Sequence, residues 1–244
     1  MVDIEFVMNV INSVSSPLAG IFAAVLAYRI SRREYHEKIK GILVKVFFPI
    51  AIGFVLYGIA QVSYTIMVQV GYDYPALHIT DFIWMIGYIL VFYGFTYFSI
   101  KMYKEREKIG QGLTYIISSL LIVGGIIGYL IGKYILGFQT GESLLQIFFD
   151  YFYPVASGLI FVASISAYLF FREVPVIKTP LLLLAITNTI YLVGDIFYTY
   201  YAWNEIYRIP GIISTGSYIV GDIIAITAFY LLFSLLGAKK GKEQ

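Results

Sequence analysis

Residues 46–68, VFFPIAIGFVLYGIAQVSYTIMV, run without a charged side chain. A helix needs about 20 consecutive apolar residues to cross the hydrocarbon core of a bilayer. Six further stretches of similar length are also predominantly apolar, one before this stretch and five after it. We therefore predict seven membrane-spanning helices, near residues 4–28, 42–69, 77–100, 112–136, 144–171, 179–202 and 211–237.

The composition of the chain argues against a soluble domain and against thiolate or paired-histidine metal sites. Of its 244 residues, 59% are hydrophobic and 13% charged, whereas soluble domains carry roughly 25% charged residues. The chain has no cysteine and two histidines, His36 and His78, which are too far apart to share a helix face. We expect no bound metal, no cofactor and no nucleic-acid partner. The expected fold is one all-α multi-pass domain over residues 1–244, in the cell membrane with the lipid bilayer around it.

The basic residues predict how the helices are oriented. Fifteen of the 17 Lys and Arg residues flank the first, third and fifth connections or follow the last span, whereas Lys133 and Arg208 alone lie on the opposite side. Cytoplasmic loops carry an excess of Lys and Arg. We therefore expect the N-terminus outside and the C-terminus in the cytoplasm, which requires an odd number of spans.

Spans two and three resemble spans six and seven at an offset of 134 residues. The matching pairs suggest a 3+1+3 parallel repeat, with halves 1–104 and 143–238 and a linker helix at 112–136. Parallel repeats occur in transporters, with the site at the interface between halves. A further match relates Pro17 of span one to Pro154 of span five. The pairs at offset 134 are Tyr57/Tyr191, Tyr64/Tyr198, Thr65/Thr199, Gly87/Gly221 and Phe95/Phe229.

The predicted linker helix carries Gly124, Gly128 and Gly132 at helical spacing. Such small-xxx-small stripes let two helix backbones approach closely in a membrane. Two interpretations stay open. The stripe packs within the bundle, or it forms the contact of a homo-oligomer.

Four carboxylates lie inside apolar spans: Asp81, Asp150, Asp195 and Asp222. A central Asp costs roughly 2.5–3.5 kcal/mol on insertion scales, so such residues face the bundle interior and mark function. Counted from the span ends, all four lie in the outer half of the membrane. Polar and aromatic residues share their helix faces or the outer halves of spans one and two. The expected ligand-binding residues are Asp81, Trp84, Tyr88, Asp150, Asp195, Asp222, Tyr191, Tyr218 and Gln61, with Asn9, Asn12, Ser13, Ser16 and Tyr64 nearby.

Two explanations of this cluster remain open. In one, hydrogen bonds between Asp and Tyr or Asn hold the bundle together. In the other, an acidic and aromatic vestibule binds a small cation, since aromatic faces attract ammonium groups. Lys133 and Arg208 at the outer rim would weaken the second explanation if they paired with the acids.

The stretches 79–98, ITDFIWMIGYILVFYGFTYF, and 191–203 with 216–233, YLVGDIFYTYYAW and GSYIVGDIIAITAFYLLF, resemble the multi-helix sensory modules that precede histidine-kinase and diguanylate-cyclase domains. That resemblance implies a sensor. No kinase or cyclase follows AKKGKEQ here, so we expect signalling to need a partner protein.

Two weaker likenesses concern other seven-span families. The 3+1+3 plan resembles SWEET sugar transporters, although an acidic vestibule does not suit a neutral sugar. The last span resembles the end of a microbial rhodopsin, but Ile226 stands where that family places its retinal-binding lysine. No Schiff base can form on that span.

The sequence thus favours a receptor-like sensor of a small, cationic extracellular ligand. A secondary transporter coupled to protons or cations is the alternative, with Thr187, Asn188, Ser164, Ser166 and Thr227 as inner-path candidates. A third possibility is a hydrolase with paired intramembrane aspartates. No catalytic motif supports it, and we do not expect an enzyme.

Overall fold

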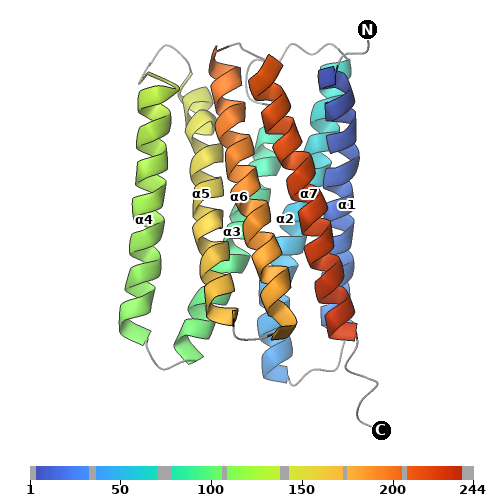
Figure 1. Ribbon diagram of the computed structural model, residues 1–244, viewed down its shortest axis with the longest axis vertical. Coiled ribbons are helices and arrows are strands. Elements are labelled where there is room, and N and C mark those ends of the chain that lie inside the picture. The colour runs from blue at the N-terminus through green and yellow to red at the C-terminus, as the bar shows by residue number, and fades with distance from the viewer. Residues whose placement is uncertain are drawn as a thin grey trace.

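The computed structural model describes residues 4–32, 37–70, 78–105, 109–137, 143–172, 175–204 and 208–237. Every regular element within these ranges is an α-helix, which confirms the predicted all-α class. The helices run alternately up and down the long axis (Figure 1). They are α1 (Ile4–Arg32), α2 (Glu37–Gln69), α3 (Ile79–Glu105), α4 (Ile109–Tyr134), α5 (Leu144–Phe171), α6 (Pro175–Asn204) and α7 (Arg208–Gly237).

Several helices extend beyond the predicted spans, most clearly at their basic ends: α1 continues to Arg32, α3 to Glu105, and α6 begins at Pro175. Hydropathy marks the part of a helix that suits hydrocarbon, whereas Arg, Lys and Glu are good helix formers that prolong it into water. Pro175 occupies the first helical position, where its missing N–H costs nothing.

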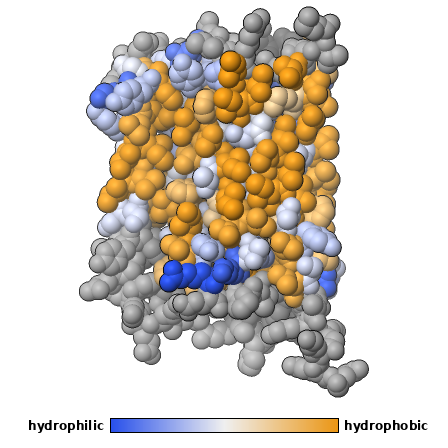
Figure 2. All heavy atoms as spheres, in the orientation of Figure 1, coloured by the Kyte–Doolittle hydropathy of each residue, from blue (hydrophilic) through white to orange (hydrophobic). Residues whose placement is uncertain are grey.

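Six of the seven helices are long and apolar enough to cross a membrane. In the remaining helix, α4, the segment Ser118–Tyr134 is apolar but shorter. Large hydrophobic side chains such as Ile21, Ile66 and Ile223 are exposed on the outside of the bundle. Figure 2 shows this as a broad apolar belt on one face, with hydrophilic residues near its two ends. The fold has the build of a helical membrane protein.

Six helices form a closed ring in the order α1, α2, α3, α5, α6, α7 and back to α1. Helix α4 stands outside this ring, against α5 and to a lesser extent α3, at one edge of the view in Figure 1. A Cβ added to Gly124 would lie 3.2 Å from Leu159, and one on Gly128 would lie 3.7 Å from Val155. The glycine stripe of α4 therefore faces α5 in the same chain. Self-association through it stays a prediction.

Glycines set the close spacing of neighbouring ring helices. A Cβ on Gly58 of α2 would lie 2.7 Å from the Cα of Pro17 in α1. A Cβ on Gly94 of α3 would lie 2.8 Å from the carbonyl oxygen of Val46 in α2. Contacts this short against backbone leave no room for a side chain, so backbones can meet here only through glycine.

The interior of the ring differs between its two ends. We call the end where α1, α3, α5 and α7 begin the pocket half, and the other end the packed half. The packed half is filled by aliphatic and phenylalanine side chains. Its fully buried members include Leu26, Ile30, Val46, Ile50, Val91, Phe95, Leu181, Leu184, Phe229 and Leu232. Phe54 meets Phe229 edge to face at 5.1 Å between ring centroids and forms the boundary with the pocket half.

Candidate functional site

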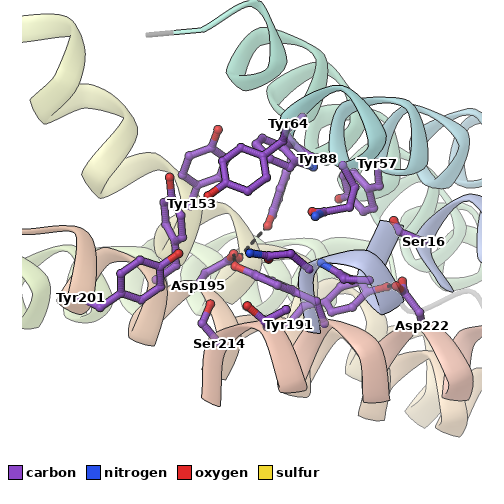
Figure 3. Close-up of a pocket in the computed structure, with 17 residues that line it drawn as sticks. Ser16, Tyr57, Tyr64, Tyr88, Tyr153, Tyr191, Asp195, Tyr201, Ser214 and Asp222 are labelled. Carbon is purple, nitrogen blue, oxygen red and sulfur yellow. Dashed lines mark hydrogen bonds between the residues drawn. The ribbon is translucent and has the colours of Figure 1, made fainter. Parts of the chain in front are cut away.

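A pocket of about 750 Å³, a volume that includes space open to solvent, lies inside the pocket half. Its walls come from α1, α2 and α3 on one side and from α5, α6 and α7 on the other. Figure 3 shows Tyr57, Tyr64 and Tyr88 on one side and Asp195, Tyr191 and Ser214 on the opposite side. The lining residues are Asn9, Asn12, Ser16, Tyr57, Gln61, Tyr64, Trp84, Tyr88, Tyr153, Tyr191, Asp195, Tyr198, Tyr201, Ser214, Thr215, Tyr218 and Asp222.

Asp195 of α6 joins four helices of the ring. Its Oδ2 accepts hydrogen bonds from Tyr88 of α3, at 2.7 Å, and from Ser157 of α5, at a very short distance. Its Oδ1 accepts a hydrogen bond of 2.5 Å from Tyr218 of α7. The side chain is 2% exposed. All three donors are neutral hydroxyls, so none of these partners balances a charge on the carboxylate.

Asp222 of α7 is held in the same manner with fewer donors. Tyr191 of α6 donates to Oδ1 at 2.5 Å, and Ser15 of α1 donates to Oδ2 at 2.7 Å. Asp222 lies 14 residues after the start of α7, which places it about 21 Å along the helix axis. Asp195 lies nine residues before the end of α6, or about 13 Å. Both carboxylates are therefore deep within the bundle, with Asp222 the deeper.

Four tyrosines surround the two carboxylates. The ring of Tyr57 lies 5.1 Å from that of Tyr88 and 6.3 Å from that of Tyr191, and Tyr191 lies 6.1 Å from Tyr218. Asp195 closes this circle, because both Tyr88 and Tyr218 donate to it. We call Tyr57, Tyr88, Tyr191 and Tyr218 the tyrosine cage.

Glycines of the next helix seat two members of this cage. A Cβ on Gly87 would lie 2.7 Å from the ring of Tyr57, and Gly221 meets the ring of Tyr191 in the same way. Both rings therefore lie directly against a neighbouring backbone. The cage is fixed by helix packing as well as by hydrogen bonds.

More aromatic rings lie closer to the pocket end of the bundle. Trp84 packs against Tyr64 at 5.8 Å and against Tyr153 at 6.4 Å, and Tyr153 meets Tyr198 at 6.0 Å. Tyr64, Trp84, Tyr198 and Tyr201 are half-buried, whereas the cage tyrosines Tyr57, Tyr88 and Tyr191 are buried. This gradient of exposure indicates that the pocket opens at the pocket end and closes toward Phe54.

Two of the predicted binding residues, Asp81 and Asp150, do not line the pocket. Asp81 accepts a hydrogen bond of 2.9 Å from the backbone N–H of His78 and one of 2.6 Å from Tyr153. It lies in the first turn of α3 and returns a bond to the residue before that helix, as in a capping box. Asp150 accepts a hydrogen bond from Gln146 one turn earlier on α5. Asp81 thus caps α3 and joins it to α5, and Asp150 bonds within α5.

The other seven predicted binding residues all line the pocket: Gln61, Trp84, Tyr88, Tyr191, Asp195, Tyr218 and Asp222. No sequence pattern singles out Ser15 and Ser157, which donate to the two carboxylates from other helices. Tyr57 stood out only through the repeat, although it lies one turn before Gln61 on α2. Tyr153 was not among the predicted binding residues; it lines the pocket, and its hydroxyl donates to Asp81.

The described lining residues include two carboxylates and no Lys, Arg or His. Lys133 is exposed on α4, 5.0 Å above the ring of Tyr134, and does not pair with either carboxylate. The side chain of Arg208 lies outside the described residues. Within the described part of the chain, no group of three or more His, Asp or Glu side chains comes together as a metal site would require. The pocket is therefore acidic and aromatic.

Comparisons of this chain with protein families, with curated proteins and with solved structures find no match.

Proposed function

We propose that this protein is a receptor-like membrane sensor that binds a small organic cation in the pocket. The observation that carries the proposal is the pairing of Asp195 and Asp222 with aromatic walls and neutral hydroxyls in one cavity. Buried carboxylates are costly without a compensating charge. A ligand cation supplies that charge, and tyrosine and tryptophan faces add cation–π attraction of about 0.5–2 kcal/mol each.

The proposal includes seven membrane spans, with the pocket half on the outer side. Among the described side chains, Arg29, Arg32, Lys45, Lys101, Arg172 and Lys178 all lie toward the packed end, whereas Lys133 lies toward the pocket end. The excess of basic residues favours a cytoplasmic packed half. The pocket then faces the exterior.

A sensor needs an outer pocket and a shape change that reaches the inner side. Asp195 connects α6 to α3, α5 and α7, and Asp222 connects α7 to α6 and α1. A cation that redistributes these hydrogen bonds would alter the contacts between most ring helices at once. The inner ends of the same helices would carry that change to a signalling partner protein.

The test is thermal unfolding of the purified protein with chloride salts of small organic cations. The panel comprises methylammonium, guanidinium and tetramethylammonium, each compared with sodium chloride at equal ionic strength. A ligand that binds only the folded state stabilises it by about 2.7 kcal/mol at 100 times its Kd. We expect at least one organic cation to raise Tm above the sodium chloride reference.

Three matched aspartate variants locate the effect. Asp195→Asn and Asp222→Asn should each abolish the ligand-dependent rise in Tm, because they remove a negative charge from the pocket wall. Asp81→Asn should retain it, because Asp81 is also buried and bonded to a tyrosine but does not line the pocket. No stabilisation by any cation, or equal stabilisation in all three variants, would show the proposal to be wrong.

Secondary transport is a second candidate, and the arrangement of the helices favours it. The pocket lies between two groups of three helices, the triplets α1–α3 and α5–α7. The two triplets are adjacent in the ring, and α4 lies outside it. We propose that the triplets are repeats. Tyr57 packs on Gly87 as Tyr191 packs on Gly221, and the Ser13 hydroxyl donates to that of Thr65, where the Thr199 hydroxyl donates to the backbone carbonyl of Asp150. Sites at such an interface are typical of transporters.

The expected inner path has little support in this conformation. Ser164, Ser166 and Thr227 donate to carbonyl oxygens of their own helices, and Thr187 donates to the carbonyl of Gly221. Fully buried Phe54, Phe229 and Leu184 fill the space below the pocket. Uptake of a stabilising cation into liposomes that contain the protein would establish transport. If the protein binds the cation but no uptake occurs, the sensor proposal is the one supported.

A further inference from the structure

If the pocket binds an organic cation, as proposed above, its hydrogen bonds bear on whether a primary or a quaternary ammonium fits better. Both oxygens of Asp195 and both oxygens of Asp222 already accept a hydroxyl hydrogen bond. A primary ammonium brings three N–H donors that need acceptors once water is removed. The five hydroxyls leave only about three of the eight lone-pair sites of the two carboxylates free, divided between Asp195 and Asp222, so a primary ammonium finds few acceptors at either one.

A quaternary ammonium has no N–H donor and makes no such demand. It needs aromatic faces and a nearby negative charge, which is the arrangement of aromatic cages that bind methylated ammonium groups. The tyrosine cage supplies four such rings, with neighbouring centroids 5.1, 6.3 and 6.1 Å apart. Asp195 and Asp222 attach directly to three of these tyrosines and leave Tyr57 as the fourth wall.

Asn12 of α1 adds a second feature of the ligand. Its side chain lines the pocket and is 3% exposed, and its Oδ1 has no hydrogen-bond partner among the described residues. Ser15, which follows Asn12 by about one turn of α1, donates to Asp222, so α1 brings Asn12 and a partner of the deeper carboxylate to the same pocket. An unpaired buried amide oxygen is costly, and one donor on a ligand would satisfy it.

We propose that the pocket selects a quaternary ammonium compound that carries one hydrogen-bond donor, with the cation in the tyrosine cage and the donor at Asn12. The cage provides the affinity for the methylated nitrogen. The amide of Asn12 distinguishes among quaternary compounds by what their fourth substituent carries.

The first test compares three probes on the wild-type protein by titration of the thermal shift: methylammonium, tetramethylammonium and (2-hydroxyethyl)trimethylammonium chloride. We expect tetramethylammonium to bind about tenfold tighter than methylammonium or better, which corresponds to about 1.4 kcal/mol. The hydroxyethyl compound should bind several-fold tighter than tetramethylammonium. Methylammonium binding equally well or better would overturn the inference, while binding that depends on Asp195 and Asp222 would still support the proposed function. If no probe bound, both would fail.

Variants separate the two parts of the inference. Tyr57→Leu should weaken tetramethylammonium binding about tenfold, whereas Tyr57→Phe keeps the aromatic face and should change it less than twofold. Asn12→Ala should abolish the advantage of the hydroxyethyl compound and leave tetramethylammonium binding intact. Unchanged binding in Tyr57→Leu would refute the cage, and a retained hydroxyethyl advantage in Asn12→Ala would refute the donor site. The comparison of probes on the wild type does not depend on either variant folding.

Discussion

The two halves of the six-helix ring are built from the same helices but filled differently. In the packed half, residues such as Ile50, Phe95 and Leu184 are buried against one another, and side-chain hydroxyls mostly bond their own helix. In the pocket half, Asp195 and Asp222 accept hydrogen bonds from five side chains on other helices. Packing by shape therefore holds one half, and a carboxylate–hydroxyl network around a cavity holds the other. Changes in the packed half should act on stability alone, whereas changes to the carboxylates and aromatic faces of the pocket half should also act on ligand binding.

The largest expected loss of stability comes from overfilling the packed half. Gly94→Leu would drive a side chain into the backbone of α2, since even a Cβ would lie 2.8 Å from the carbonyl oxygen of Val46. We expect a loss of about 3 kcal/mol or failure to fold. The matched control is Gly125→Leu on α4, where a Cβ meets nothing within 4 Å and Tm should stay unchanged. Equal effects of the two variants would contradict the assigned packing.

A smaller loss is expected at the boundary between the halves. Phe54→Ala removes a fully buried ring that packs on Phe229, Tyr57 and Tyr191. Lipid is as apolar as the core, so the loss is mainly one of packing, and we expect about 2 kcal/mol. Cation affinity should change less than threefold, because Phe54 does not line the pocket. If Phe54→Ala abolished cation binding without lowering Tm, packing and ligand binding would not be divided between the two halves.

Removal of one hydroxyl from the pocket network should have a lesser effect on stability. Tyr218→Phe deletes one of three donors to Asp195 and keeps the aromatic face. Hydrogen bonds between membrane helices are worth about 0.6 kcal/mol on average and at most about 1.7. We expect a loss within that range in a chemical denaturation assay and retained tetramethylammonium binding. A loss above 3 kcal/mol would show that this one bond contributes far more than hydrogen bonds between membrane helices do.

The smallest effect is expected where a carboxylate lies outside the pocket. Tyr153→Phe removes the hydroxyl that donates to Asp81 at 2.6 Å, and a loss of about 0.6 kcal/mol is expected. A double-mutant cycle with Asp81→Asn measures the coupling of the pair, which should be of the same size. Neither variant should change the affinity for tetramethylammonium by more than twofold. If both variants strongly weakened tetramethylammonium binding, Asp81 would have to be counted as a binding residue.

Much of the fold and the site can be predicted from this sequence. The helices follow from hydropathy, and seven of the nine expected binding residues line the pocket, because a polar group in an apolar helix must face inward. Asp81 and Asp150 follow the same rule but lie near helix starts, where capping and local bonds use their oxygens. Ser15 and Ser157 carry no sequence signal of their own, and Tyr57 carries only that of the repeat, because serine and tyrosine are common in such helices and only their partners distinguish them.

By itself, the sequence determined that the chain forms long apolar helices whose few acids turn away from lipid. Those properties are local, since they depend on side-chain type and on spacing along one helix. Tertiary structure decided which helices form the ring, that α4 stays outside it, and which hydroxyls meet Asp195 and Asp222. The rotation and spacing of each helix are set by contacts such as Gly94 on Val46 and Gly87 on Tyr57. Such contacts join residues far apart in the chain, so no single segment contains the information that places them.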